Sequence, residues 1–309
     1  MGNAWVLALN TFREATRDRV THALLAAGGV LVVAAFGIAQ LSLDQQVRVL
    51  IDIGIAALSL MTLVGALVLS APLIQREVER RTLYMMLTRP LARTSFTVGK
   101  YAGVLLTLAV TCSLLGTLLL WLIVVQVGKA SPSLAVVMAL TLGAGIATAL
   151  LQRKYTASVL VFAVASLLAA LALAAKATPL WLPVACLILL AALEGALLAG
   201  LTLGLASFST PMLSALMATG IWIAGRSADL MATTQSKVLP DTIKSALRVT
   251  ARIVPNFQLY APKRHVIESM VLSPAGAQPY LLQVSLYTLA YAGSLVLLAA
   301  LIFRRRNLA

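Results

Sequence analysis

The strongest constraint on the fold is a series of apolar runs, each about as long as the ~20 residues that an α-helix needs to cross a bilayer. Of the 309 residues, 61% are hydrophobic and 11% are charged, whereas soluble domains carry about 25% charged residues. The sequence therefore predicts an all-α integral membrane protein with about eight transmembrane helices. These helices are expected at residues 21–42, 53–74, 101–127, 133–151, 156–175, 180–206, 209–226 and 281–303.

The distribution of charge predicts how these helices are oriented. With a cytoplasmic N-terminus, eight spans place residues 75–100, 152–155 and the tail 304–309 in the cytoplasm, and all three are basic, as the positive-inside rule requires. Residues 227–280 then form an extracytoplasmic loop, although they hold six Lys or Arg against three Asp or Glu. A loop of about 54 residues is near the length at which the rule weakens. We therefore expect both termini in the cytoplasm, with the transmembrane domain covering residues 21–303.

Residues 1–20, before the first run, predict an interfacial amphipathic helix. Trp5, Leu9 and Phe12 fall on one helical face, together with Thr16, and the charged side chains lie elsewhere around the helix. Such a helix lies flat on the cytoplasmic membrane surface. We prefer it to a solvated, frayed tail, because a tail would leave Trp5 and Phe12 exposed.

A polar stretch, residues 75–100, separates the second and third runs and holds six basic residues against two acidic ones. Residues 77–87 contain no Gly or Pro, and their apolar side chains fall near helical spacing, which predicts a short amphipathic helix that Pro90 would end. We expect this helix to lie along the cytoplasmic membrane face and to contact a partner. The alternative is a surface loop that is held by lipid head groups alone.

The sequence carries little that suggests catalysis. It has no phosphate-binding Gly-x4-Gly-Lys-Ser/Thr loop, so the chain is not expected to bind ATP itself. No metal-ligand pattern surrounds His22 or His265, and Cys112 and Cys186 lie inside apolar runs as small core residues. The net charge of +14 is assigned to loops that face anionic lipid rather than to nucleic-acid binding. An enzyme is therefore disfavoured, and no metal site is expected.

One carboxylate, Glu194, lies near the middle of the run 180–206. A charge at that depth costs about 3 kcal/mol unless it is paired, protonated or facing water. Two hypotheses follow: Glu194 belongs to a translocation path or gate, or it is a structural residue that stays protonated and hydrogen-bonds a neighbouring helix. The run 180–206 contains no cation, so any charged partner must come from another segment.

Three motifs occur in order along the chain. The first is Glu79-x2-Thr82-Leu83-x3-Leu87-x2-Pro90-x2-Arg93-x5-Gly99-Lys100. The second is Leu-Ala-Ser-Phe-Ser-Thr-Pro at residues 205–211, and the third is Val-Pro-Asn-Phe at residues 254–257, with Phe-Arg-Arg-Arg at residues 303–306 near the end of the chain. Together they resemble the permease subunits of type-2 ABC exporters, which form the membrane-spanning half of ATP-driven transporters.

The resemblance implies a six-span core, so two segments within residues 133–175 would be an inserted pair. They are separated only by residues 152–155 and are compatible with a tight helical hairpin or with part of one longer, tilted helix pair. The resemblance also implies that residues 1–20 form the connecting helix and that residues 75–90 form the coupling helix, which docks on a cytosolic ABC ATPase subunit. The residues expected to make that contact are Glu77, Glu79, Arg80, Arg81, Thr82, Leu83, Leu87, Pro90 and Arg93.

The same resemblance implies the partners and the location. ATP and Mg would be bound by the ATPase subunit, and this chain would bind no cofactor itself. The working unit would contain a second copy of the permease and two ATPases, in contact with lipids of a bacterial plasma (inner) membrane. Two other hypotheses stay open: an ion-coupled secondary transporter with Glu194 as its proton site, and a non-transporting membrane scaffold or assembly factor. No feature of the sequence identifies a substrate.

Overall fold

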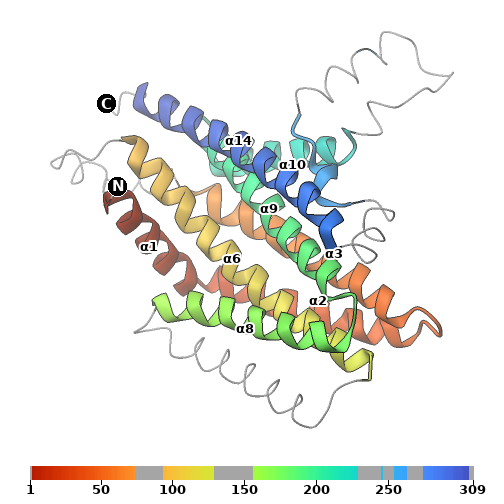
Figure 1. The fold of residues 1–309 in the computed structure, drawn as a ribbon. Helices are drawn as coiled ribbons and strands as arrows, with labels where there is room; N and C mark the ends of the chain where they lie inside the picture. The colour runs from red at the N-terminus through yellow and green to blue at the C-terminus, as the bar shows by residue number, and fades with distance from the viewer. Residues whose placement is uncertain are drawn as a thin grey trace.

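The computed structural model describes residues 2–73, 75, 93–128, 156–228, 245, 254–262 and 274–305. Throughout these residues the regular structure is helical, which confirms the predicted all-α class (Figure 1). The helices are α1 (Gly2–Arg17), α2 (Arg19–Gln40), α3 (Gln46–Ser70), α6 (Arg93–Gln126), α8 (Thr156–Ala177), α9 (Trp181–Ala206), α10 (Pro211–Arg226), the short 3-10 helix η1 (Phe257–Tyr260) and α14 (Pro274–Arg305).

Six helices in the described part are long and apolar enough to cross a membrane, and they match six of the eight predicted runs: α2, α3, α6, α8, α9 and α14. The predicted run 133–151 lies outside the described residues. The predicted run 209–226 forms α10, whose 16 residues are about 24 Å long at 1.5 Å per residue. That is shorter than the ~30 Å hydrocarbon core, so the count of eight spans stays a prediction.

Helices α6 and α8 run in the same direction, although they follow each other among the described helices. Val159 of α8 packs beside Val110 of α6, and further along, Ser166 Oγ lies 3.4 Å from Thr117 Oγ1. The end of α6 and the beginning of α8 therefore lie at different depths of the bundle. If residues 133–151 form a span between α6 and α8, as predicted, these two helices must run in the same direction, as they do.

Helices α9 and α14 are also parallel. Ala277 packs with Cys186 near the beginning of both helices, and further along, a Cβ on Gly200 would lie 3.3 Å from Ala292 Cβ. The end of α14 and the N-terminal helix α1 lie at the same end of the bundle (Figure 1). The side of the membrane on which the termini lie stays a prediction.

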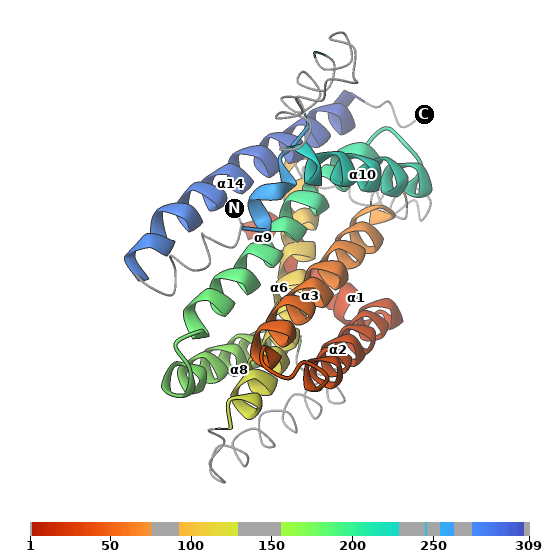
Figure 2. The same ribbon diagram turned by 90° about the vertical axis from the view of Figure 1, so that its right-hand side faces the viewer.

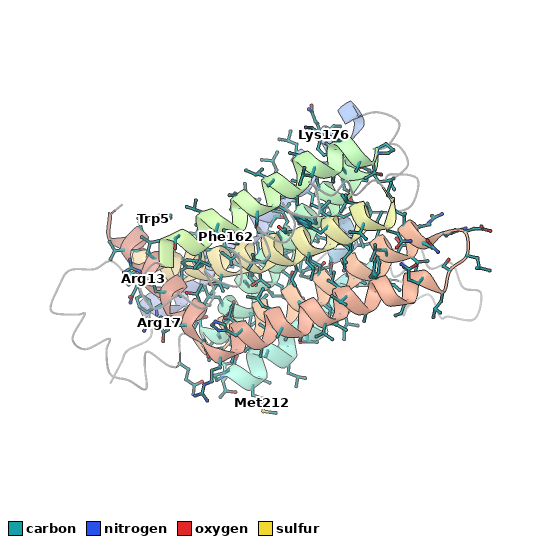
Figure 3. The ribbon with its side chains drawn as sticks, turned by 90° about the horizontal axis from the view of Figure 1, so that it is seen from below. Trp5, Arg13, Arg17, Phe162, Lys176 and Met212 are labelled. Atoms are coloured by element: carbon teal, nitrogen blue, oxygen red, sulfur yellow. The ribbon has the colours of Figure 1, made fainter. Side chains whose placement is uncertain are left out.

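Helix α1 packs tightly along the beginning of α6 because two glycines allow a close approach. A Cβ at Gly99 would lie 2.7 Å from the Ala4 carbonyl oxygen, and one at Gly103 would lie 2.5 Å from Thr11 Cβ. Phe12 is fully buried, as the predicted face requires, but Trp5 is 56% exposed and projects away from the bundle (Figure 3). At Gly99 and Gly103, α6 packs against a different face of α1 from the face on which the largest apolar residues of α1 lie.

Residues 254–262 lie inside the helical bundle. They belong to the segment expected to form an extracytoplasmic loop, yet Phe257 is fully buried and Tyr260 is 4% exposed. Asn256 caps η1, because its side-chain oxygen accepts a hydrogen bond from the Gln258 N–H at 2.9 Å. Figure 2 shows η1 against α9 and between α10 and α14. This part of the predicted loop is therefore a buried element that helps to hold three helices together.

Candidate functional site

Most of the predicted ATPase contact lies outside the described residues. This applies to Glu77, Glu79, Arg80, Arg81, Thr82, Leu83, Leu87 and Pro90. Arg93 is the first residue of α6, but the structure does not describe its side chain. What the structure establishes is where the charged segment leaves the bundle, after α3, and where it returns, at α6.

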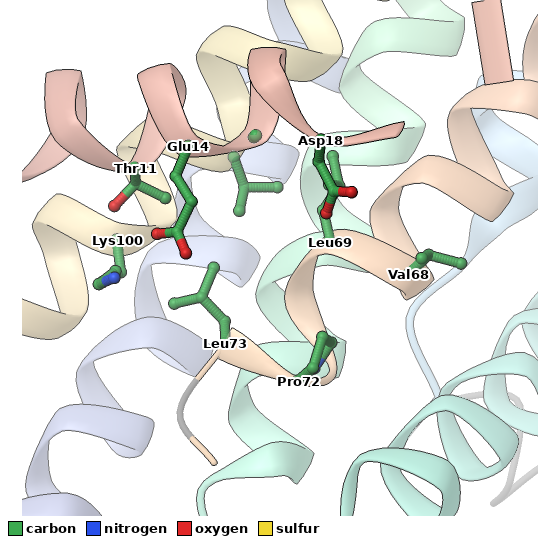
Figure 4. A pocket seen from close by; sticks show the side chains of 10 residues that line it. Thr11, Glu14, Asp18, Val68, Leu69, Pro72, Leu73 and Lys100 are labelled. Atoms are coloured by element: carbon green, nitrogen blue, oxygen red, sulfur yellow. The ribbon is translucent and has the colours of Figure 1, made fainter. Parts of the chain in front are cut away.

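A pocket lies beside both of these points (Figure 4). Leu73, two residues before Gln75, and Lys100, about two turns into α6, both line it together with Glu14 and Asp18 of the α1 end of the chain. Lys100 is 6% exposed, and its ammonium group lies 5.7 Å from the centroid of the Phe96 ring. Described residues on both sides of the predicted coupling segment therefore lie beside Glu14 of α1 and Asp18.

Glu194, the predicted intramembrane residue, is buried near the middle of α9. Glu194 lies 13 residues after Trp181, the first residue of α9, and 12 residues before Ala206, the last. Its side chain is 3% exposed. Helix α9 is apolar around its whole circumference, because it packs against α3, α6, α10 and α14. A carboxylate at this position must find its partners across a helix interface.

Both partners of Glu194 come from α10. The Trp222 indole Nε1 donates a hydrogen bond to Oε1 at 2.8 Å. Arg226 Nη2 lies 2.9 Å from Oε1 and donates to Oε2 at 3.1 Å. Trp222 and Arg226 are one helical turn apart and so share a face of α10, and the guanidinium carbon lies 5.5 Å from the Trp222 ring centroid. The predicted need for a partner from another segment is met by this pair.

Tyrosine side chains from three other elements surround α9 and α10. Tyr101 of α6 donates a hydrogen bond to the Ala196 carbonyl at 2.9 Å. Tyr260 of η1 shares a 2.7 Å hydrogen bond with Thr288 of α14, and burial raises the pKa of its phenol above the ordinary value, so the hydroxyl stays neutral. Tyr287 accepts a 2.9 Å hydrogen bond from the Asn256 backbone N–H. The charged pair therefore lies within a polar, aromatic cluster of an otherwise apolar bundle.

Sequence reasoning identified Glu194 but missed Trp222 and Arg226. The sequence contained a signal for Arg226. This residue ends the apolar run 209–226, which directly follows the run 180–206 that contains Glu194. An arginine at the end of a predicted span is ordinarily assigned to the membrane surface, where it reaches the lipid head groups. Only the tertiary contact between α9 and α10 places it at the depth of Glu194.

The cluster can hold a positive charge, but within the described residues it offers no metal site. No group of three or more His, Cys, Asp or Glu is found in the part of the chain that the structure describes. Cys112 and Cys186 are free and buried, as expected for core residues. The chemistry that the cluster supports is the recognition of a cation by one carboxylate and an aromatic ring.

Comparison with protein-family models and with curated proteins finds no match for this chain. The resemblance to type-2 ABC permeases therefore depends on the three sequence motifs.

Proposed function

We propose that this chain is the membrane-spanning permease subunit of an ATP-driven ABC exporter. The observation that carries the proposal is where the described residues on either side of the charged segment lie. Leu73 and Lys100 line one pocket together with Glu14 of the amphipathic helix α1, at the end of the bundle where α14 also ends. The sequence has no phosphate-binding Gly-x4-Gly-Lys-Ser/Thr motif of its own, so a basic segment whose flanking residues lie at one end of the bundle is a suitable contact for a separate ATPase.

Helix α6 gives a physical route from that contact into the membrane. It continues without a break for 34 residues from Arg93 to Gln126, which is about 51 Å. Along this length it packs against α1, α2, α3, α8, α9 and α14. A movement of the ATPase at residue 93 would therefore displace a rigid element that contacts most of the bundle.

In this proposal the partners keep the roles that the resemblance implies. The ATPase subunit binds ATP and Mg, a second copy of the permease completes the translocation unit, and membrane lipids surround both. The ion pair between Glu194 and Arg226 joins α9 to α10 inside the membrane. It supports the gating hypothesis for Glu194, because α10 cannot leave α9 without separating two charges.

The ATPase contact is tested by co-purification. The permease is expressed with a candidate ABC ATPase, and residues 76–90 are replaced by a Gly/Ser segment of equal length. We expect the ATPase to be lost from the purified complex, and Glu79→Ala or Arg81→Ala to weaken it. The matched control is Arg48→Ala with Asp52→Ala, two exposed charged residues at the other end of α3. Retention of the ATPase by a folded 76–90 replacement would disprove the proposal.

Glu194→Gln tests the gate within the same complex. Glutamine keeps the size and a hydrogen-bond acceptor but removes the charge, so we expect folded protein whose ATP-driven transport is impaired. Full transport by this variant would remove the gating role. Transport driven by an imposed proton gradient without ATP would instead favour the ion-coupled alternative.

A further inference from the structure

Glu194 and Trp222 together form a recognition site for one positive charge. The carboxylate is almost fully enclosed, with 3% of its side chain exposed, and the indole N–H fixes its orientation through the 2.8 Å hydrogen bond. The Trp222 ring lies within reach of the charge that the carboxylate holds, at 5.5 Å from centroid to guanidinium carbon. A carboxylate beside an aromatic face is the arrangement with which proteins bind organic cations.

The present occupant of this site is a side chain of the protein itself. Arg226 is the last residue of α10, and 26% of its side chain is exposed. Its hydrogen bonds to the described residues run through Nη2 alone. The guanidinium therefore lies at a helix end, where part of the side chain is exposed.

The occupant cannot withdraw without a replacement. An unpaired carboxylate among membrane helices is costly, and the Trp222 hydrogen bond supplies no positive charge. A proton or another cation must therefore satisfy Glu194 when the guanidinium of Arg226 withdraws, and the aromatic ring of Trp222 favours a cation. Because the site lies between apolar helices, a molecule that brings this charge must also be soluble in an apolar environment.

We propose that Glu194 and Trp222 bind the positively charged group of an amphipathic organic cation, and that Arg226 occupies this site when the cation is absent. That this cation is the exported molecule rests on the proposed function; its binding does not require the ATPase. Binding exchanges Arg226 for the ligand and so breaks the ion pair between α9 and α10. The ligand then lies between Glu194 of α9 and Trp222 of α10 in place of the Arg226 guanidinium.

The test uses the purified full-length chain in lipid nanodiscs and two probes that resemble the arginine head group. Methylguanidinium should raise the melting temperature of Arg226→Ala by several degrees, but not that of the wild type or of Arg226→Ala combined with Glu194→Gln. Dodecylguanidinium should bind Arg226→Ala at least about tenfold more tightly than the wild type, because the internal competitor is gone. Arg48→Ala, which removes an exposed arginine outside the site, should behave like the wild type.

Three results would overturn the proposal: no rescue by methylguanidinium, equal rescue when Glu194 is also changed, or a preference of Arg226→Ala for dodecanoate over dodecylguanidinium. If Arg226→Ala does not fold, Arg226→Lys takes its place. Lysine is a weaker competitor because it lacks the planar guanidinium, so this variant should bind dodecylguanidinium more tightly than the wild type, and equal binding would contradict the site.

The outcomes separate this inference from the proposed function. Binding of dodecylguanidinium by a chain that recruits no ATPase would leave the cation site intact and disprove the ABC permease assignment. An ATPase complex that binds no dodecylguanidinium in any of these variants would disprove the site and leave the assignment intact.

Discussion

Two helix contacts in this protein are made by opposite means. Helix α1 approaches α6 through glycines and small side chains, with an apolar surface that leaves no room for a Cβ at Gly99 or Gly103. Helix α10 is joined to α9 by an ion pair and an indole hydrogen bond. The first contact depends on shape and the second on charge. The comparison predicts that changes of shape disturb the contact of α1 with α6, whereas changes of charge at Glu194 disturb the contact of α10 with α9.

The largest expected effect comes from the charged contact. Arg226→Ala leaves Glu194 buried beside the indole without a positive partner, and we expect a loss of about 3 kcal/mol in the free energy of unfolding. The loss is measured by denaturant titration in detergent. Combining Arg226→Met with Glu194→Gln removes both charges and should recover most of the stability. If the double variant is as unstable as Arg226→Ala, packing rather than charge holds α10 in place.

A somewhat smaller effect is expected at the shape-dependent contact. In Gly103→Val the new Cβ would lie only 2.5 Å from Thr11 Cβ, and overpacking of this kind costs about 2 kcal/mol. Proteolysis of α1 reports its release from α6. Gly37→Ala in α2 is the matched control, because nothing lies within 4 Å of a Cβ there. Undiminished protection of α1 in Gly103→Val would mean that α1 and α6 are not locked together.

The smallest effect is expected at the buried element beside the charged pair. Tyr287→Phe removes the hydroxyl that accepts the Asn256 N–H, and the loss of one such hydrogen bond costs about 1 kcal/mol. The same unfolding titration measures it. A cost above that of Arg226→Ala would show that residues 254–260, and not the ion pair with Glu194, are the main connection that holds α10 in the bundle.

The parts of the structure that could be predicted are those set by a local rule. Leucine- and alanine-rich runs of span length became α2, α3 and α9 because backbone polar groups in a bilayer must bond within a helix. A carboxylate inside such a run is costly without a partner, which is why the sequence alone identified Glu194 as a candidate residue.

The parts that could not be predicted depend on contacts between elements distant in sequence. The glycine surface of α6 turns Trp5 outward, although Trp5 is one of the largest apolar residues of α1. Pro255 packs closely against Gly225, since a Cβ added at Gly225 would lie 2.3 Å from the Pro255 carbonyl oxygen. This contact places part of the predicted extracytoplasmic loop inside the bundle. The position of Arg226 follows from the turn between α9 and α10, and neither helix reveals it alone.

The short length of α10 has a consequence for the surrounding lipid. This helix begins beside the C-terminal end of α9, directly after residues 207–210, and its last residue reaches the middle of α9 at Glu194. In the membrane placement that we propose, its outer face, with Met212 85% exposed and Leu216 67% exposed, meets the acyl chains of a single leaflet. Changes in chain length or saturation in that leaflet would alter the lateral pressure on α10, whereas the same changes in the opposite leaflet would leave it untouched.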